Sequence, residues 1–183
     1  FTQHAITHYA ENREAQQLYR ESVQIASGYA DNYNKYSFSL QDFQKQMQSL
    51  GEYLSAQICI MDNQGNILFD STDESVGKDA ANANYKTLKG FNTSDFGNRY
   101  YMTGNFYGSF SEKNLTVFSP ITSNYRIHSY VMIHKTVSSI TQNANGFMNF
   151  VFYSIAFVCL TALFRRVLFA HGFSRQVHRL AIV

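Results

Sequence analysis

The fold class of this 183-residue chain follows from one segment, which reads Gln57-Ile-Cys-Ile-Met-Asp-Asn-Gln-Gly-Asn-Ile-Leu-Phe-Asp70. Two short runs rich in apolar residues, 57–61 and 66–70, flank the polar residues between Asp62 and Gly65. This composition is typical of a tight turn, in which Gly65 can adopt a positive φ. The segment therefore predicts a β-hairpin, and Asp62 is better explained as a turn cap than as a metal ligand.

Three further strands are predicted downstream of the hairpin, at 99–110, 114–121 and 126–134. The turns between them lie at 111–113 and 123–124. With the hairpin they make a mostly antiparallel sheet of five strands. The connection 71–98 is rich in small and polar residues, and irregular segments of this length often bind ligands.

Two helices are predicted before the hairpin, so the fold class is α+β. Residues 4–33 repeat apolar side chains at steps of three and four, and Ser39 is a good N-cap for a second helix over 40–54. The long first helix carries two neighbouring stripes, namely Leu18, Ser22, Ile25 and Tyr29, and Tyr19, Val23, Ala26, Ala30 and Tyr33. These two stripes indicate either that the helix contacts both its own domain and a second copy of the chain, or that they form one wide stripe that faces the core.

A membrane-spanning helix is predicted near the C-terminus, because residues 147–164 contain no charged residue and are long enough to cross a bilayer. The alternative is a buried core helix, but such helices are rarely apolar on all sides. The last 19 residues contain no acid and four arginines, Arg165, Arg166, Arg175 and Arg179. These predict that 165–183 is cytoplasmic and that 1–146 lies outside the cell membrane.

The apolar periodicity continues without interruption from Val137 into this uncharged run. We therefore expect the last strand to pass directly into a helix that becomes the membrane span. The chain begins at Phe1 without an initiator methionine, and we expect it to be a fragment.

Composition and motifs argue against several classes of function. Residues 1–146 contain 11 Lys and Arg against 13 Asp and Glu, so nucleic-acid binding is not expected, and lipid headgroups are the better partner for the basic tail. No motif of a serine hydrolase, zinc protease or nucleotide-binding loop occurs. His4 and His8 have metal-binding spacing, but Glu11 is the only nearby carboxylate. We predict no catalytic residue, metal or cofactor, and no disulfide between Cys59 and Cys159.

A ligand pocket is predicted around the tyrosine-rich segment 99–110, because tyrosine combines a flat apolar face with a hydroxyl group. Even spacing predicts that Tyr101 and Tyr107 share one strand face and that Arg126, His128 and Tyr130 share a face of the neighbouring strand. Arginines can pair with a ligand carboxylate. We expect the 71–98 segment to bound this pocket together with Arg99, Tyr101, Tyr107, Arg126, His128 and Tyr130. The opposite strand faces, with Met102, Phe106, Val131 and Ile133, should then pack against the helices. The alternative is a tyrosine-rich sheet with surface arginines.

Three segments resemble the PAS-like (Cache-type) extracytoplasmic sensor domains of bacterial membrane histidine kinases. The segment 55–71 is similar to their first hairpin, and 115–121 and 130–135 are similar to their last two strands. The resemblance covers roughly residues 10–165 and implies a PAS-like sheet. Beyond residue 166, however, the chain lacks the Arg-Pro that often opens the usual linker, and it lacks a phosphoacceptor histidine box. Arg99-Tyr-Tyr101 only partly matches the amino-acid-binding motif of some members.

The resemblance implies four parts: a signalling helix at 1–35, a sensor domain at 36–136, a connecting and transmembrane helix at 137–166, and a cytoplasmic tail at 167–183. We expect the sensing part of a two-component sensor histidine kinase, which acts as a homodimer and responds to a small molecule or a protein. The alternatives are a chemoreceptor or cyclase sensor, a membrane-anchored interaction protein without a small ligand, and, last, an enzyme.

Overall fold

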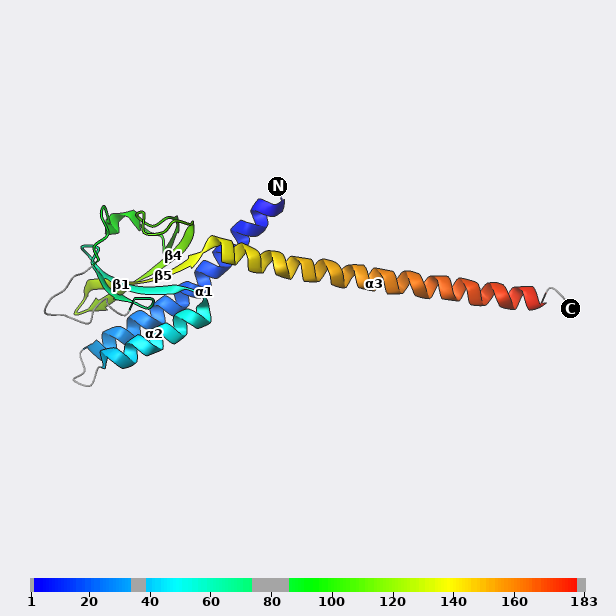
Figure 1. The fold of residues 1–183 in the computed structure, drawn as a ribbon, viewed down its shortest axis with the longest axis horizontal. Coiled ribbons are helices and arrows are strands. Elements are labelled where there is room, and N and C mark those ends of the chain that lie inside the picture. Colours follow the sequence, from blue (N-terminus) through cyan, green and yellow to red (C-terminus); the bar gives the residue numbers. More distant parts are fainter. Residues whose placement is uncertain (1, 34–38, 74–85, 181–183) are drawn as a thin grey trace. The chain divides into compact units, whose positions relative to one another are not determined.

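The computed structural model describes residues 2–33, 39–73 and 86–180 and confirms an α+β fold (Figure 1). It divides into two compact units, Phe1–Thr141 and Gln142–Val183. The elements in chain order are α1 (Thr2–Tyr33), α2 (Leu40–Leu54), β1 (Gln57–Asp62), β2 (Ile67–Asp70), the 3₁₀ helix η1 (Thr93–Asp95), β3 (Tyr101–Gly104), β4 (Asn114–Ser123), β5 (Arg126–Thr136) and α3 (Val137–Leu180).

The sheet has five strands in the order β2-β1-β5-β4-β3, and every neighbouring pair is antiparallel, as predicted. The hairpin turn between β1 and β2 is also confirmed. The Asp62 carboxylate accepts hydrogen bonds from the backbone N–H groups of Gln64 and Asn66, both at 2.9 Å. Gly65 has a φ of 86°, a value that residues with a Cβ rarely adopt.

Both helices of the first unit begin and pack as their sequences indicate. Ser39 caps α2 by accepting a hydrogen bond from the Asp42 backbone N–H. On α1, the side chains of Leu18, Ser22 and Ile25 are buried, which confirms the core-facing stripe. In the neighbouring stripe, Ala26 is also buried and Tyr19 and Ala30 pack against the core, as the alternative of one wide core-facing stripe predicts, whereas Val23 is 41% exposed. A contact of α1 with a second copy stays a prediction.

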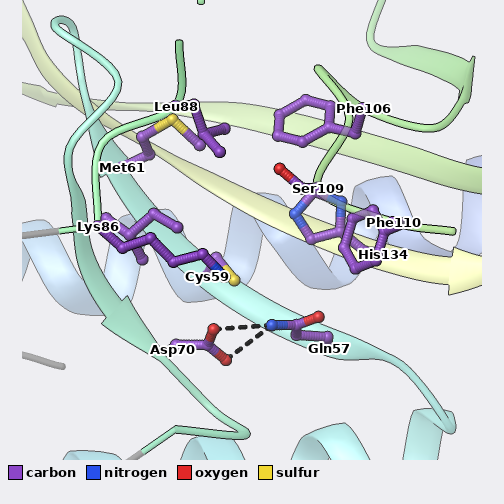
Figure 2. A pocket seen from close by; sticks show the side chains of 11 residues that line it. Gln57, Cys59, Met61, Asp70, Lys86, Leu88, Phe106, Ser109, Phe110 and His134 are labelled. Atoms are coloured by element: carbon purple, nitrogen blue, oxygen red, sulfur yellow. Dashed lines mark hydrogen bonds between the residues drawn. The ribbon is translucent and has the colours of Figure 1, made fainter. Parts of the chain in front are cut away.

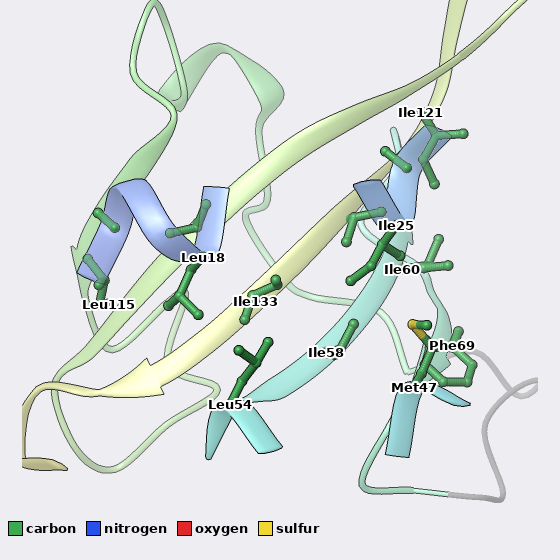
Figure 3. Packing of buried hydrophobic residues seen from close by; sticks show 14 of the residues in the cluster. Leu18, Ile25, Met47, Leu54, Ile58, Ile60, Phe69, Leu115, Ile121 and Ile133 are labelled. Atoms are coloured by element: carbon green, nitrogen blue, oxygen red, sulfur yellow. The ribbon is translucent and has the colours of Figure 1, made fainter. Parts of the chain in front are cut away.

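The main hydrophobic core lies between these helices and one face of the sheet (Figure 3). Alternation along each strand directs one set of side chains to this face. The labelled members are Leu18, Ile25, Met47, Leu54, Ile58, Ile60, Phe69, Leu115, Ile121 and Ile133. Because a buried aliphatic or aromatic side chain contributes roughly 1.5–3 kcal/mol, this layer is the main source of stability in the first unit.

A second, smaller cluster covers the opposite face of the sheet, where no helix longer than η1 packs in the described residues. Its buried members are Cys59, Met61, Ile67, Leu88, Phe96, Phe106, Phe118 and Met132. Val131 and Ile133 do pack on the helix side, as predicted. The prediction for Met102 and Phe106 is wrong, since both belong to this second cluster.

Met102 lies within β3, so the face of this strand was assigned the wrong way round: Tyr101 packs on the helix side and Met102 on the other. The strand predicted at 99–110 is also shorter than expected. β3 spans only Tyr101–Gly104, and the chain then forms a turn in which Phe106 and Tyr107 have positive φ. The turn ends the alternation of side chains between faces, so spacing beyond Gly104 no longer indicates a common face.

The second unit contains most of α3, whose first residues, from Val137, directly follow β5 and belong to the first unit. The expected passage from the last strand into the helix is therefore confirmed. Within α3, the segment Val137–Arg166 is long and apolar enough to cross a membrane. Its large apolar side chains, among them Phe150, Phe157 and Leu160, are exposed, as expected for contact with lipid.

Candidate functional site

The second face of the sheet holds a cavity of about 140 Å³. It is bounded by β1, the ends of β2 and β5, the described end of the β2–β3 connection and the turn after β3 (Figure 2). The lining residues are Gln57, Cys59, Met61, Ile67, Asp70, Lys86, Leu88, Phe106, Ser109, Phe110 and His134. The combination of aromatic and aliphatic walls with a few polar groups is typical of a small-molecule site.

The antiparallel register brings the polar groups of this cavity together. Gln57 pairs with His134 across β1 and β5, and Cys59 pairs with Asp70 across β1 and β2. Because Gln57 and Cys59 are two residues apart on β1, they project from the same face as His134. The strands therefore place these groups without help from a flexible loop.

His134 is buried in the cavity wall, with 4% of its surface exposed. Its Nδ1 lies 2.9 Å from the Thr116 hydroxyl oxygen, and its ring contacts the rings of Phe106 and Phe110 at centroid distances of 4.7 and 4.9 Å. Burial lowers its pKa to about 4, although the nearby Asp70 carboxylate opposes this effect. At neutral pH the imidazole is uncharged, so Nε2 is free to donate or accept one hydrogen bond to an occupant.

Asp70 is buried, and neighbouring groups hold its carboxylate in place. The side-chain amide of Gln57 donates to both carboxylate oxygens, at 2.9 and 2.7 Å. The backbone N–H and the hydroxyl of Thr72 donate to Oδ1 at 2.9 and 2.8 Å. These hydrogen bonds compensate the cost of burying the charge and fix the amide of Gln57 beside the cavity.

Cys59 is not arranged as a nucleophile. Burial, followed by the nearby Asp70 carboxylate, raises the pKa of its thiol well above the usual value, so the thiol is protonated at neutral pH. In the described part of the chain, no group of three or more His, Cys, Asp and Glu side chains could hold a metal ion. The geometry supports binding of a small molecule without providing a catalytic pair.

Two of the six predicted site residues lie on the cavity side of the sheet, next to the lining. The Tyr107 hydroxyl donates to Asp95 Oδ2 at 2.7 Å, and the Tyr130 ring packs on Phe96 at 5.5 Å. Tyr101 lies on the other side, where its hydroxyl donates to Asn12 of α1 at 2.6 Å. The expectation that Tyr101 and Tyr107 share one face is therefore wrong.

The other three predicted residues are exposed and lie apart from this cavity. Arg126 and His128 are near the β4–β5 turn, and Arg99 precedes β3. His128 borders a different hollow, of about 390 Å³, with Tyr29 and Leu68 among its other lining residues. Ligand binding by the six residues stays a prediction. Of the 71–98 segment, only Lys86 and Leu88 line the first cavity, and 74–85 lies outside the described residues.

The lining residues Gln57, Asp70, Lys86 and His134 did not emerge from the sequence as site candidates. A signal for two of them was present, because Gln57 and His134 occupy the alternate positions to Ile58 and Ile133 within apolar strands. A polar residue on the second face of a two-sided strand is a candidate for a cavity wall. Gln57 and His134 meet only because β1 lies beside β5, and this neighbourhood depends on the strand order.

No model of a known protein family matches the sequence, and a comparison with curated proteins found no similar one. The architecture, a helix followed by a five-stranded antiparallel sheet, is roughly compatible with a PAS-like fold.

Proposed function

We propose that the first unit is the extracytoplasmic PAS-like (Cache-type) sensor domain of a two-component sensor histidine kinase and that α3 relays its state across the membrane. The observation that carries the proposal is the course of β5. This strand contributes His134 to the cavity lining and passes into α3 at Val137, only three residues later. A molecule in the cavity would therefore act on the strand that continues into the membrane-spanning segment.

The relay requires that the occupant bind one state of the domain more tightly than another, since equal affinity shifts no equilibrium. The two faces of β5 offer a route for such a preference, because one contacts the cavity and the other contacts the core. His134 faces the cavity, whereas Ile133 and Lys135 face the helices. A shift of β5 toward or away from an occupant would change both sets of contacts.

The chemistry of the lining narrows the class of ligand. Phe106, Phe110 and Leu88 provide an apolar wall, whereas the His134 imidazole and the Lys86 ammonium provide polar contacts. A cavity of about 140 Å³ is close to the size that accommodates a single benzene molecule, so it suits a very small organic molecule rather than a peptide. We infer a ligand with one apolar part and one hydrogen-bonding end.

A protein signal is the second candidate, and the turn between β4 and β5 favours it. Tyr125 is fully exposed there, and Ile127 is 43% exposed, next to the exposed Arg126. Tyrosine and arginine are enriched in protein interfaces. A chemoreceptor or cyclase would use the same domain with a different cytoplasmic output.

The test is a thermal-shift screen of small metabolites on the full chain in detergent, followed by the same titration on variants. A true ligand should raise the melting temperature of the wild type and of the surface control Tyr125→Phe. It should have little effect on His134→Gln and Lys86→Ala. Stabilisation that persists in both cavity variants, or a screen without any stabilising compound, would contradict the small-molecule proposal.

A further inference from the structure

The turn at 105–110 forms one wall of the cavity. It contributes Phe106, Ser109 and Phe110 to the lining, and Figure 2 shows the rings of Phe106 and Phe110 on either side of the Ser109 side chain, next to His134. Two backbone hydrogen bonds close the turn, from Ser109 N–H to the Phe106 carbonyl oxygen and from Phe110 N–H to the Asn105 carbonyl oxygen. The turn is therefore a defined local element.

This turn has an unfavourable backbone conformation. Phe106, Tyr107 and Gly108 are consecutive residues with φ of 41°, 54° and 76°. Glycine adopts such values readily, but large side chains rarely do. Residues in this region persist only where the surrounding contacts hold them, and they are found frequently at ligand clamps and switch segments.

One side chain of the turn holds it to the neighbouring segment. The Tyr107 hydroxyl donates to Asp95 Oδ2 at 2.7 Å and lies 3.4 Å from the Asn92 carbonyl oxygen. The Tyr107 ring also packs edge-on against Phe91 at 5.6 Å. A hydrogen bond to a charged carboxylate is stronger than one between neutral groups, so the contact with Asp95 is suited to act as a latch.

We propose that the turn 105–110 is a strained lid on the cavity, held closed by the hydrogen bond between Tyr107 and Asp95. Release of this bond lets the turn relax from its left-handed conformation and withdraws Phe106 and Phe110 from the lining. The lid thereby controls access of a small molecule to the cavity. This role in ligand entry rests on the proposed sensing function, but the movement of the lid does not.

The lid also contacts β5. Phe106 and Phe110 both contact the ring of His134, which Thr116 holds from β4. Opening the lid removes both aromatic contacts from one side of His134. Entry of a molecule and the state of β5 are therefore coupled through the same two rings.

Cys59 provides a reporter of lid opening, because it lines the cavity and is only 3% exposed. In the full chain with Cys159→Ser, it is the single thiol. Methyl methanethiosulfonate methylthiolates a thiol that it can reach. The Cys59 thiolate attacks the sulfenyl sulfur, a disulfide forms, methanesulfinate leaves, and the thiol proton passes to the buffer. When the lid closes faster than the reagent reacts, the rate of labelling, followed by mass spectrometry, is proportional to the population of the open state.

The critical variant is Tyr107→Phe, which keeps the ring but removes the hydroxyl. We expect Cys59 to be labelled about tenfold faster than in the Cys159→Ser parent, the size of effect typical for a lost hydrogen bond to a charged group. Asp95→Ala should give the same increase. Tyr125→Phe is the matched control, since Tyr125 also has a positive φ but is fully exposed at a distant turn. Its labelling rate should equal that of the parent.

A labelling rate in Tyr107→Phe within twofold of the parent would overturn the proposal. A parent rate that rises with low concentrations of urea in proportion to global unfolding would overturn it as well, because Cys59 would then be reached only by unfolding. Since the readout uses no ligand, faster labelling in both latch variants supports the lid even if no compound binds. In that case only the sensing function would fail.

Discussion

Among single residues, His134 links the chemistry of the cavity to the stability of the domain. Its pKa is lowered to about 4 in the folded protein, below the ordinary value of 6.5, because the site is fully buried. Between these two pH values the unfolded chain binds a proton that the folded chain excludes. The fold is therefore more stable above pH 6.5 than in acid. This contribution of His134 is lost as the pH falls from 6.5 toward 4.

The wild type should lose about 2 kcal/mol more stability than His134→Gln on going from pH 7 to pH 4.5. Urea unfolding of both full chains in detergent at the two pH values gives the four unfolding free energies that the comparison needs. The comparison cancels the titration of exposed groups, which both proteins share. Equal pH dependence in the two proteins would show that His134 is not buried in its neutral form.

Gly65 is a second residue at which the effect of a substitution on stability can be predicted from the backbone and its neighbours. Its φ is 86°, and a Cβ added there would lie 2.9 Å from the Cβ of Phe91. Gly65→Ala should therefore destabilise the domain by about 2 kcal/mol, from backbone strain and from the displaced ring together. Gly28→Ala is the matched control, because nothing lies within 4 Å of that position on α1. It should raise stability by about 0.5–1 kcal/mol, and equal effects of both would contradict the hairpin geometry.

At the scale of elements, one ion pair connects the end of β5 to α1. The Lys135 ammonium lies 2.6 Å from Glu14 Oε1, and the two side chains are only 10% and 24% exposed. Breaking such a pair leaves an unpaired, largely buried charge, so the loss exceeds that of a surface pair.

Glu14→Gln should reduce the unfolding free energy by about 1–3 kcal/mol, and Lys135→Met in the same chain should recover much of the loss. A double-mutant cycle on thermal or urea unfolding measures the coupling. The neighbouring pair of Lys113 and Glu11 is longer, at 3.8 Å, and its lysine is 60% exposed, so it serves as the reference and should show weaker coupling. Coupling between Glu14 and Lys135 no larger than in this reference pair would contradict the link between α1 and β5.

The elements were predictable where local chemistry determines them. The turn from Asp62 to Gly65, the Ser39 cap and the passage from β5 into α3 each depend on neighbouring residues, and all three were predicted correctly. The end of β3 was not, because the left-handed turn at Phe106 has no simple signal in a sequence that lacks glycine at that position. The cavity was missed for a different reason, since Gln57 and His134 meet only through the order of the strands.

At the scale of the whole molecule, the orientation across the membrane is a prediction from the four C-terminal arginines. In a Cys159→Ser background, Arg126→Cys should react with a membrane-impermeant maleimide on intact cells. Arg175→Cys should react only after the cells are made permeable. Each variant serves as the control for the other. Labelling of position 175 from outside intact cells would contradict the predicted orientation.

The relay through α3 is tested most directly by a fluorophore at position 175 of the full chain in nanodiscs, with Cys159→Ser and Arg175→Cys. Cys59 is buried and remains unlabelled under native conditions. A compound that stabilises the wild type in the thermal-shift screen should change the emission of this fluorophore at the concentration at which it binds. The same compound should leave the emission of His134→Gln unchanged. Saturating binding to the wild type with unchanged emission would contradict the relay.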